Sequence, residues 1–131
     1  GCPPDGAPWR VLVVDDNAVN LELQTYVLAD AGWQVRGCTG VDDALVLLSQ
    51  WRPDVILTDI QMPRRDGFDL VRAVRADPSL AATPVVALTA FAMKGDEQRM
   101  HEAGCDGYIA KPIDVDTFAD TVKGWARTGP G

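Results

Sequence analysis

The sequence predicts an α/β protein built on a doubly wound parallel β-sheet, and two observations support this prediction. Five short apolar runs alternate along the chain with five stretches whose apolar residues recur at helical spacing. Three of the runs are continuous and rich in Val, Ile and Leu, which is typical of strands covered on both faces. Such alternation favours a parallel sheet with helices on both faces, joined by right-handed crossovers.

The apolar runs define the expected strands. The continuous ones are the first, third and fourth, with the sequences VLVV, VILT and VVAL. The five expected strands are residues 11–14, 34–38, 55–58, 85–88 and 108–110. Five strands in this alternation fit the order 2-1-3-4-5 of flavodoxin-like (βα)5 folds, whose functional crevice lies beyond the carboxyl ends of the strands.

The first two expected helices each carry one apolar face. Residues three and four positions apart lie on the same side of a helix. In the first helix the residues on that face are Val19, Leu23, Tyr26 and Val27. In the second they are Val41, Ala44, Leu45 and Leu48.

The other three helices are bounded by turn and capping residues. The third follows Asp66-Gly67, and its apolar face is Phe68, Val71 and Val74. The fourth is expected at residues 94–103 and ends at Gly104. The fifth is expected to start at Asp114 as its N-cap, and its apolar residues are Val115, Phe118, Val122 and Trp125.

Composition and charge narrow the class of protein. A chain of 131 residues suits one domain, and the net charge of −7 argues against direct nucleic-acid binding, which needs a basic face. No apolar run reaches the length of a membrane span and no signal-peptide pattern opens the chain, so we expect no membrane insertion. The three cysteines, Cys2, Cys38 and Cys105, have no metal-ligand spacing, and we interpret them as reduced thiols in a cytoplasmic setting.

The two ends of the chain are rich in Pro and Gly. We interpret residues 1–9 as a linker or a cloning remnant and residues 127–131 as a flexible tail. The folded domain is then expected at residues 10–126, which suits a domain cut from a longer protein.

Charged and polar residues follow four of the five expected strands. They are Asp15-Asp16 after the first, Asp59 after the third, Thr89-Ala90 after the fourth and Lys111-Pro112 after the fifth. Because these strands are neighbours around the expected switch point, three carboxylates, a hydroxyl and an ammonium should meet at one edge.

Each of these residues also has an ordinary structural interpretation. Asp15 or Asp16 could cap the first helix, Asp59 could end its strand in a turn, and Thr89 and Lys111 could be a strand residue and a solvated lysine. Their coincidence at neighbouring strand ends favours a functional interpretation. Close carboxylates repel one another, and a hard divalent cation such as Mg²⁺ relieves that repulsion. The group suits phosphoryl transfer, and an Asp carboxylate can itself form an acyl phosphate.

At these residues the sequence resembles the receiver domain of two-component response regulators, over about residues 10–126. The matching segments are VLVVDDN, DVILTDIQMPRRDGFDL, VVALTAFA and GCDGYIAKPID, in that order. DDNAVN and LTAFAMKGD are most similar to receivers within hybrid histidine kinases and to some single-domain regulators. The resemblance implies a phosphoacceptor signalling domain that catalyses its own phosphorylation and slow dephosphorylation, with a histidine kinase or histidine phosphotransfer domain as its partner.

The resemblance also implies a role for each site residue. Asp59 would receive a phosphoryl group from a phosphohistidine. Asp15, Asp16, Asp59 and the backbone carbonyl of Gln61 would hold Mg²⁺. Thr89, the Ala90 amide and Lys111 would bind the phosphoryl oxygens, and Thr89 and Tyr108 would form a conformational switch. The Lys111-Pro112 bond is expected to be cis.

Three other classes share part of the pattern. A phosphatase of the haloacid-dehalogenase type needs a second Asp two residues after the nucleophile, where this chain has Gln61, and a cap domain. A flavodoxin needs a hydroxyl- and Gly-rich loop after the first strand, where two aspartates would repel a phosphate. A receiver-like module that is never phosphorylated would not need the acidic pocket.

Overall fold

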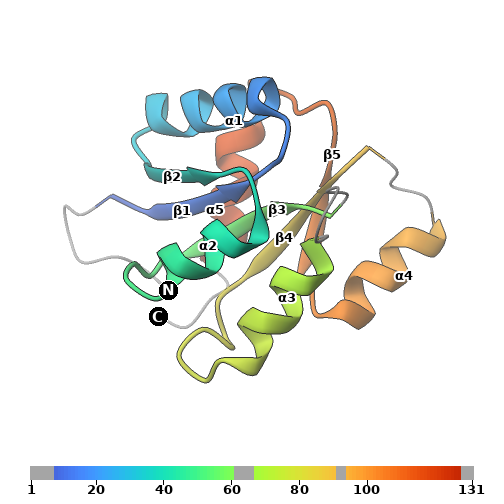
Figure 1. Cartoon of the computed structure of the whole chain (residues 1–131). Helices are drawn as coiled ribbons and strands as arrows, with labels where there is room; N and C mark the ends of the chain where they lie inside the picture. The colour runs from blue at the N-terminus through green and yellow to red at the C-terminus, as the bar shows by residue number, and fades with distance from the viewer. Residues whose placement is uncertain (1–7, 61–66, 91–93, 128–131) are drawn as a thin grey trace.

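The computed structural model describes residues 8–60, 67–90 and 94–127 of the chain. Five strands form one parallel sheet in the order β2-β1-β3-β4-β5, as the sequence predicts (Figure 1). The strands are β1 Arg10–Val14, β2 Gln34–Cys38, β3 Val55–Asp59, β4 Val85–Thr89 and β5 Gly107–Ala110. Each differs from its predicted range by at most one residue at either end.

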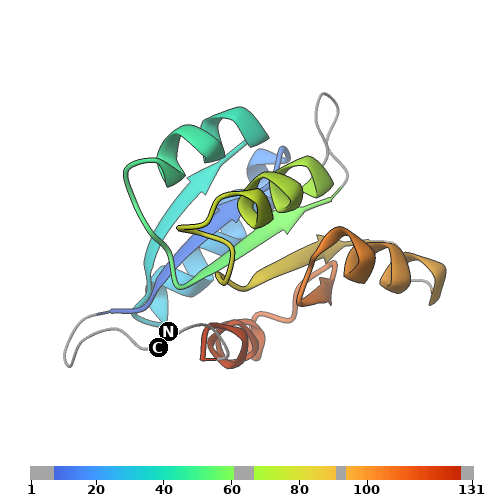
Figure 2. The ribbon, with the colours of Figure 1, turned by 90° about the horizontal axis from the view of Figure 1, so that it is seen from below.

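Five helices in the described residues cover both faces of the sheet. They are α1 Ala18–Asp30, α2 Val41–Leu48, α3 Gly67–Ala76, α4 Lys94–Ala103 and α5 Phe118–Ala126. Figures 1 and 2 show α1 and α5 on one face, and α2 and α3 on the other. Helix α4 joins the layer of α2 and α3, because Met100 is buried in the same apolar cluster. The predicted doubly wound α/β class is therefore confirmed.

The core consists of two apolar layers separated by the sheet. In β1, Leu12 and Val14 pack in one layer while Val11 and Val13 pack in the other, and all four side chains are fully buried. This two-sided burial is the physical reason why the central strands are continuously apolar instead of alternating.

The predicted apolar face of α1 is wrong for three of its four residues, and Val27 is the one that packs as predicted. Val19, Leu23 and Tyr26 are 74%, 43% and 69% exposed. The buried residues of α1 are instead Gln24 and Leu28, with Leu21 and Val27 packed against the same layer. Counting apolar residues favoured the exposed face because the buried face carries a polar residue at its centre.

The predicted start of α5 also differs from the structure. Helix α5 begins at Phe118, and Asp114 lies in a preceding turn where its Oδ1 accepts the Asp116 N–H at 2.9 Å. Val115 is 51% exposed because it lies in that turn, whereas Phe118 and Val122 are buried as predicted.

Helix α4 ends as predicted. Gly104 has a φ of +107°, a conformation that favours glycine, and the Cys105 N–H donates to the Met100 carbonyl at 3.0 Å. The Lys111-Pro112 peptide bond is cis, which confirms that prediction.

Two cysteines fall within the described residues, Cys38 and Cys105, and both are free thiols. Burial raises the pKa of Cys105 to about 11, so this thiol stays protonated at neutral pH. None of the described helices is long and apolar enough to cross a membrane.

Candidate functional site

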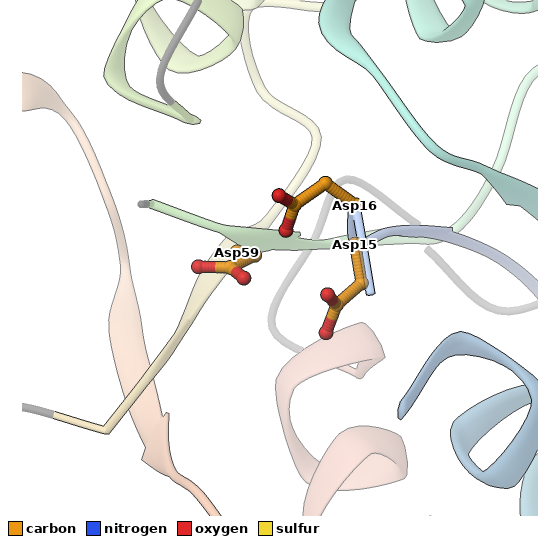
Figure 3. A group of neighbouring side chains, drawn as sticks. All are labelled: Asp15, Asp16 and Asp59. Carbon is orange, nitrogen blue, oxygen red and sulfur yellow. The ribbon is translucent and has the colours of Figure 1, made fainter. Parts of the chain in front are cut away.

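The carboxyl ends of β1 and β3 bring three carboxylates together. Asp15 and Asp16 follow β1 directly, and Asp59 is the last residue of β3. One oxygen of each carboxylate lies within 4.8 Å of the others (Figure 3). Asp15 and Asp59 are buried, whereas Asp16 is exposed. The predicted acidic cluster therefore exists and is open to solvent through Asp16.

Lys111 joins two of these acids. Its Nζ lies 3.0 Å from Oδ2 of Asp15 and 2.8 Å from Oδ2 of Asp59. The Lys111 N–H also donates to the Thr89 carbonyl at 2.8 Å, which holds the lysine just beyond the β4–β5 pairing. Burial by itself would lower the pKa of Lys111, but its hydrogen bonds and charge interactions with Asp59 and Asp15 outweigh that effect and raise the pKa. The ammonium therefore stays charged beside the acids.

The charge of the cluster suits a divalent cation. Within the described residues, the three carboxylates and the Lys111 ammonium sum to a formal charge of −2 in a partly buried site. Carboxylate oxygens are the protein ligands that Mg²⁺ prefers. The residues present thus fit the ion that the sequence predicts.

The Asp15 carboxylate accepts more hydrogen bonds than the sequence predicts. Its Oδ1 accepts the Asn17 N–H at 2.9 Å. Its Oδ2 accepts a bond of 3.3 Å from Nε2 of Gln24, in addition to the Lys111 ammonium. Gln24 was not among the predicted site residues. The spacing of Leu21, Gln24 and Leu28, which places the glutamine on an apolar face, could have revealed it.

Thr89 and Tyr108 lie on the same face of the sheet. Thr89 is buried at the end of β4 and pairs with Ala110, while Tyr108 of β5 pairs with Ala87. Because residues two apart along a strand point the same way, Thr89 and Tyr108 are diagonal neighbours. Tyr108 is half-buried against the layer formed by α2, α3 and α4.

Two predicted site residues remain, Ala90 and Gln61. Ala90 directly follows β4 and is exposed. Gln61, the predicted backbone ligand of Mg²⁺, lies outside the described residues. The structure therefore brings together Asp15, Asp16, Asp59 and Lys111, with Thr89 at the end of the strand next to β3.

A five-stranded parallel sheet with clustered aspartates and a lysine at its carboxyl edge is a doubly wound α/β domain whose site suits phosphoryl transfer. Residues 11–123 match the family model described as "Response regulator receiver domain". The chain belongs to this family, and it is a phosphoacceptor domain of two-component signalling. The family match excludes the phosphatase and flavodoxin alternatives.

Known proteins of similar sequence and structure are also response regulators. The chain is 41% identical over 119 residues to the polar-differentiation response regulator DivK of Brucella anthropi, which covers 90% of this chain and 96% of that protein. It superimposes on the chemotaxis response regulator CheY4 of Vibrio cholerae with a TM-score of 0.84 at 31% identity, covering 89% and 98% of the two chains.

Receivers of sensor kinases are similar as well. The receiver domain of sensor histidine kinase PA1611 of Pseudomonas aeruginosa, solved with a magnesium ion in its active-site cleft, matches with a TM-score of 0.83 at 30% identity. That match covers 92% of this chain and 99% of the other. Since stand-alone regulators and kinase receivers both match, the similarity to hybrid kinases stays a prediction, as does the division into residues 1–9, 10–126 and 127–131.

Proposed function

We propose that Asp59 is the residue that receives the phosphoryl group, and that the donor is a phosphohistidine on a histidine kinase or a histidine phosphotransfer domain. The observation that carries this proposal is the position of Asp59. It is a buried carboxylate at the end of β3, 2.8 Å from a charged lysine and beside two further acids. The test is phosphoryl uptake from a small acyl-phosphate donor, with the Asp59 variant described in the Discussion.

In the proposed reaction, a carboxylate oxygen of Asp59 attacks the phosphorus atom of the phosphohistidine. An O–P bond forms as the P–N bond breaks, and the electron pair of the P–N bond stays with the imidazole, which takes up a proton from water. The product is an acyl phosphate. Lys111 would neutralise charge on the phosphoryl oxygens, and Thr89 Oγ and the Ala90 amide would donate hydrogen bonds to them.

We also propose Mg²⁺ as the cofactor, with Asp15, Asp16, Asp59 and the Gln61 carbonyl as its protein ligands. The ion would offset charge on the phosphoryl oxygens during transfer. The same groups would allow the domain to catalyse its own phosphorylation from small donors and its own dephosphorylation. The support for this proposal is the convergence of carboxylate oxygens within 4.8 Å and their excess negative charge.

Addition of Mg²⁺ should stabilise the fold, because the ion binds the native cluster and not the unfolded chain. At ten times the dissociation constant the stabilisation is about 1.4 kcal/mol, which raises the melting temperature by a few degrees. The Asp16→Asn variant should lose this response. Thermal melts with EDTA and with millimolar Mg²⁺ measure it.

The matched control for this experiment is Asp30→Asn, because Asp30 is an exposed carboxylate at the other end of α1. It should keep the full response to Mg²⁺. Coinciding melts of the unsubstituted protein with and without Mg²⁺ would contradict the proposed metal site.

The exposed apolar residues of α1 offer a surface on which a partner protein could bind, next to the acidic cluster. Val19, Leu23 and Tyr26 are spaced four and three residues apart and share one face of α1, which begins two residues after Asp16. We propose that the phosphohistidine domain packs on this face while its histidine approaches Asp59, because burial of these side chains would favour association.

Phosphorylation should change the environment of Tyr108 through Thr89. The phosphoryl group offers oxygen acceptors to the Thr89 hydroxyl, and movement of that side chain changes the space next to its diagonal neighbour Tyr108. The Thr89→Ala variant should keep Mg²⁺ binding but show a smaller change at the Tyr108 ring. NMR with and without beryllofluoride, a mimic of the phosphoryl group, measures the effect.

Beryllofluoride shifts at Tyr108 that are equal in the unsubstituted protein and in Thr89→Ala would contradict this coupling. Tyr108 would then be a static, half-buried aromatic residue of β5.

A further inference from the structure

Gln24 is a buried polar residue in the middle of an otherwise apolar helix face. It is 2% exposed and lies between Leu21 and Leu28 on the side of α1 that packs toward the sheet. Its Nε2 donates to Oδ2 of Asp15 at 3.3 Å. Its Oε1 is buried and, within the described part of the chain, has no hydrogen-bond partner.

Packing does not explain a glutamine at this position. A buried carbonyl oxygen without a partner destabilises a fold by roughly 1–3 kcal/mol. An apolar side chain of similar volume would fill the same space without that penalty. Gln24 forms a hydrogen bond with Asp15 that an apolar residue at this position could not form.

Asp15 depends on the Gln24 amide because its other side-chain partner, Lys111, is shared with Asp59. The carboxylate is fully buried, and its Oδ2 receives only Gln24 and the Lys111 ammonium in the described contacts. Lys111 also binds Asp59 at 2.8 Å. A phosphoryl group on Asp59 would attract the same ammonium, and Gln24 would then be the remaining side-chain donor to Oδ2 of Asp15.

We infer that Gln24 is a positioning residue for the metal site: it fixes the orientation of the Asp15 carboxylate toward the cation, whether or not Lys111 is bound to Asp15. This inference rests on the proposed function. An amide suits the task because it donates a hydrogen bond to a carboxylate without adding charge. A lysine or arginine there would compete with the cation, and a glutamate would repel Asp15. Partners that orient metal ligands in this way typically contribute 10- to 100-fold to metal affinity.

The decisive variant is Gln24→Met, which keeps the length of the side chain and removes the donor. Calorimetry should show Mg²⁺ binding about tenfold weaker than in the unsubstituted protein. In EDTA the melting temperature should change little, because removal of the unpartnered Oε1 offsets the loss of the hydrogen bond to Asp15. Gln98→Met is the matched control: Gln98 is exposed on α4 and bonds to Glu102, so Mg²⁺ affinity should not change.

A purely structural role of Gln24 predicts the reverse pattern, with a lower melting temperature in EDTA and an unchanged Mg²⁺ affinity, and that result would overturn the inference. Gln24→Leu repeats the test with a second apolar side chain if the methionine variant does not fold. If the unsubstituted protein itself binds no Mg²⁺, the proposed function fails and this inference fails with it. Normal binding by the unsubstituted protein and by both apolar variants would overturn only the role of Gln24.

Discussion

Replacement of Asp59 by Asn should abolish phosphoryl uptake from a small acyl-phosphate donor in the presence of Mg²⁺. The amide oxygen is a poor nucleophile, and no acyl phosphate can form on it. The variant should still fold, because Asn has nearly the same shape, its Oδ1 can accept the Lys111 bond, and one charge leaves a repulsive cluster. Mass spectrometry of the intact protein measures the uptake, and hydroxylamine should release the group from the unsubstituted domain.

The control is Asp120→Asn, which replaces an exposed carboxylate in the first turn of α5. It should be phosphorylated as fast as the unsubstituted protein. Labelling of Asp59→Asn at the original level would show that another residue is the acceptor. A complete lack of labelling in the unsubstituted protein would favour a receiver-like module that is not phosphorylated.

Replacement of Arg75 by Met should destabilise the fold strongly for a substitution of a partly exposed residue. The guanidinium donates two hydrogen bonds to the Gly104 carbonyl, at 3.0 and 2.8 Å, and one each to the carbonyls of Ala81 and Thr83, at 2.8 and 2.7 Å. It also binds Oδ2 of Asp106 at 2.6 Å, and that oxygen accepts the Val85 N–H at 2.8 Å. One side chain thus links α3, the segment before β4, the end of α4 and the start of β5.

The expected loss is about 3 kcal/mol, which corresponds to roughly two charged hydrogen bonds, since water can replace the more exposed ones. A change of that size lowers the melting temperature of a domain this long by roughly 10 °C. Methionine keeps the apolar stem of the arginine, so the loss reports the hydrogen bonds and not the packing. Denaturant or thermal unfolding measures it.

Arg72→Met is the matched control on the same helix. Arg72 makes one ion pair, with Asp69 at 2.5 Å, and its side chain is 60% exposed. Exposed pairs of this kind contribute about 0–1 kcal/mol. Similar losses in the two variants would contradict the role of Arg75 as the link between these four segments.

The contribution of Arg75 was not predictable from the sequence. Its acceptors are 6 to 31 residues away along the chain, and most of them are backbone carbonyls, which carry no signature of residue type. An arginine in the last turn of a helix fits equally well as a solvated residue that complements the helix dipole.

The sequence by itself determined the strands, their order and the acidic site. Strands buried on both faces must be continuously apolar, so β1, β3 and β4 could be recognised in the sequence as apolar runs. Once the order was known, the residues that end neighbouring parallel strands had to meet, which is why Asp15, Asp16, Asp59 and Lys111 were found without coordinates.

Only the tertiary structure decided which side of α1 is buried and what lies there. Two helix faces were available, and the predicted one, which carries Val19, Leu23 and Tyr26, proved to be exposed. The other face is buried because Leu21, Val27 and Leu28 pack in the apolar layer, and Gln24 is satisfied among them by its bond to Asp15. Helical periodicity measures the apolar character of a face, but a polar residue is buried when a distant partner satisfies it, and that partner is known only after the chain has folded.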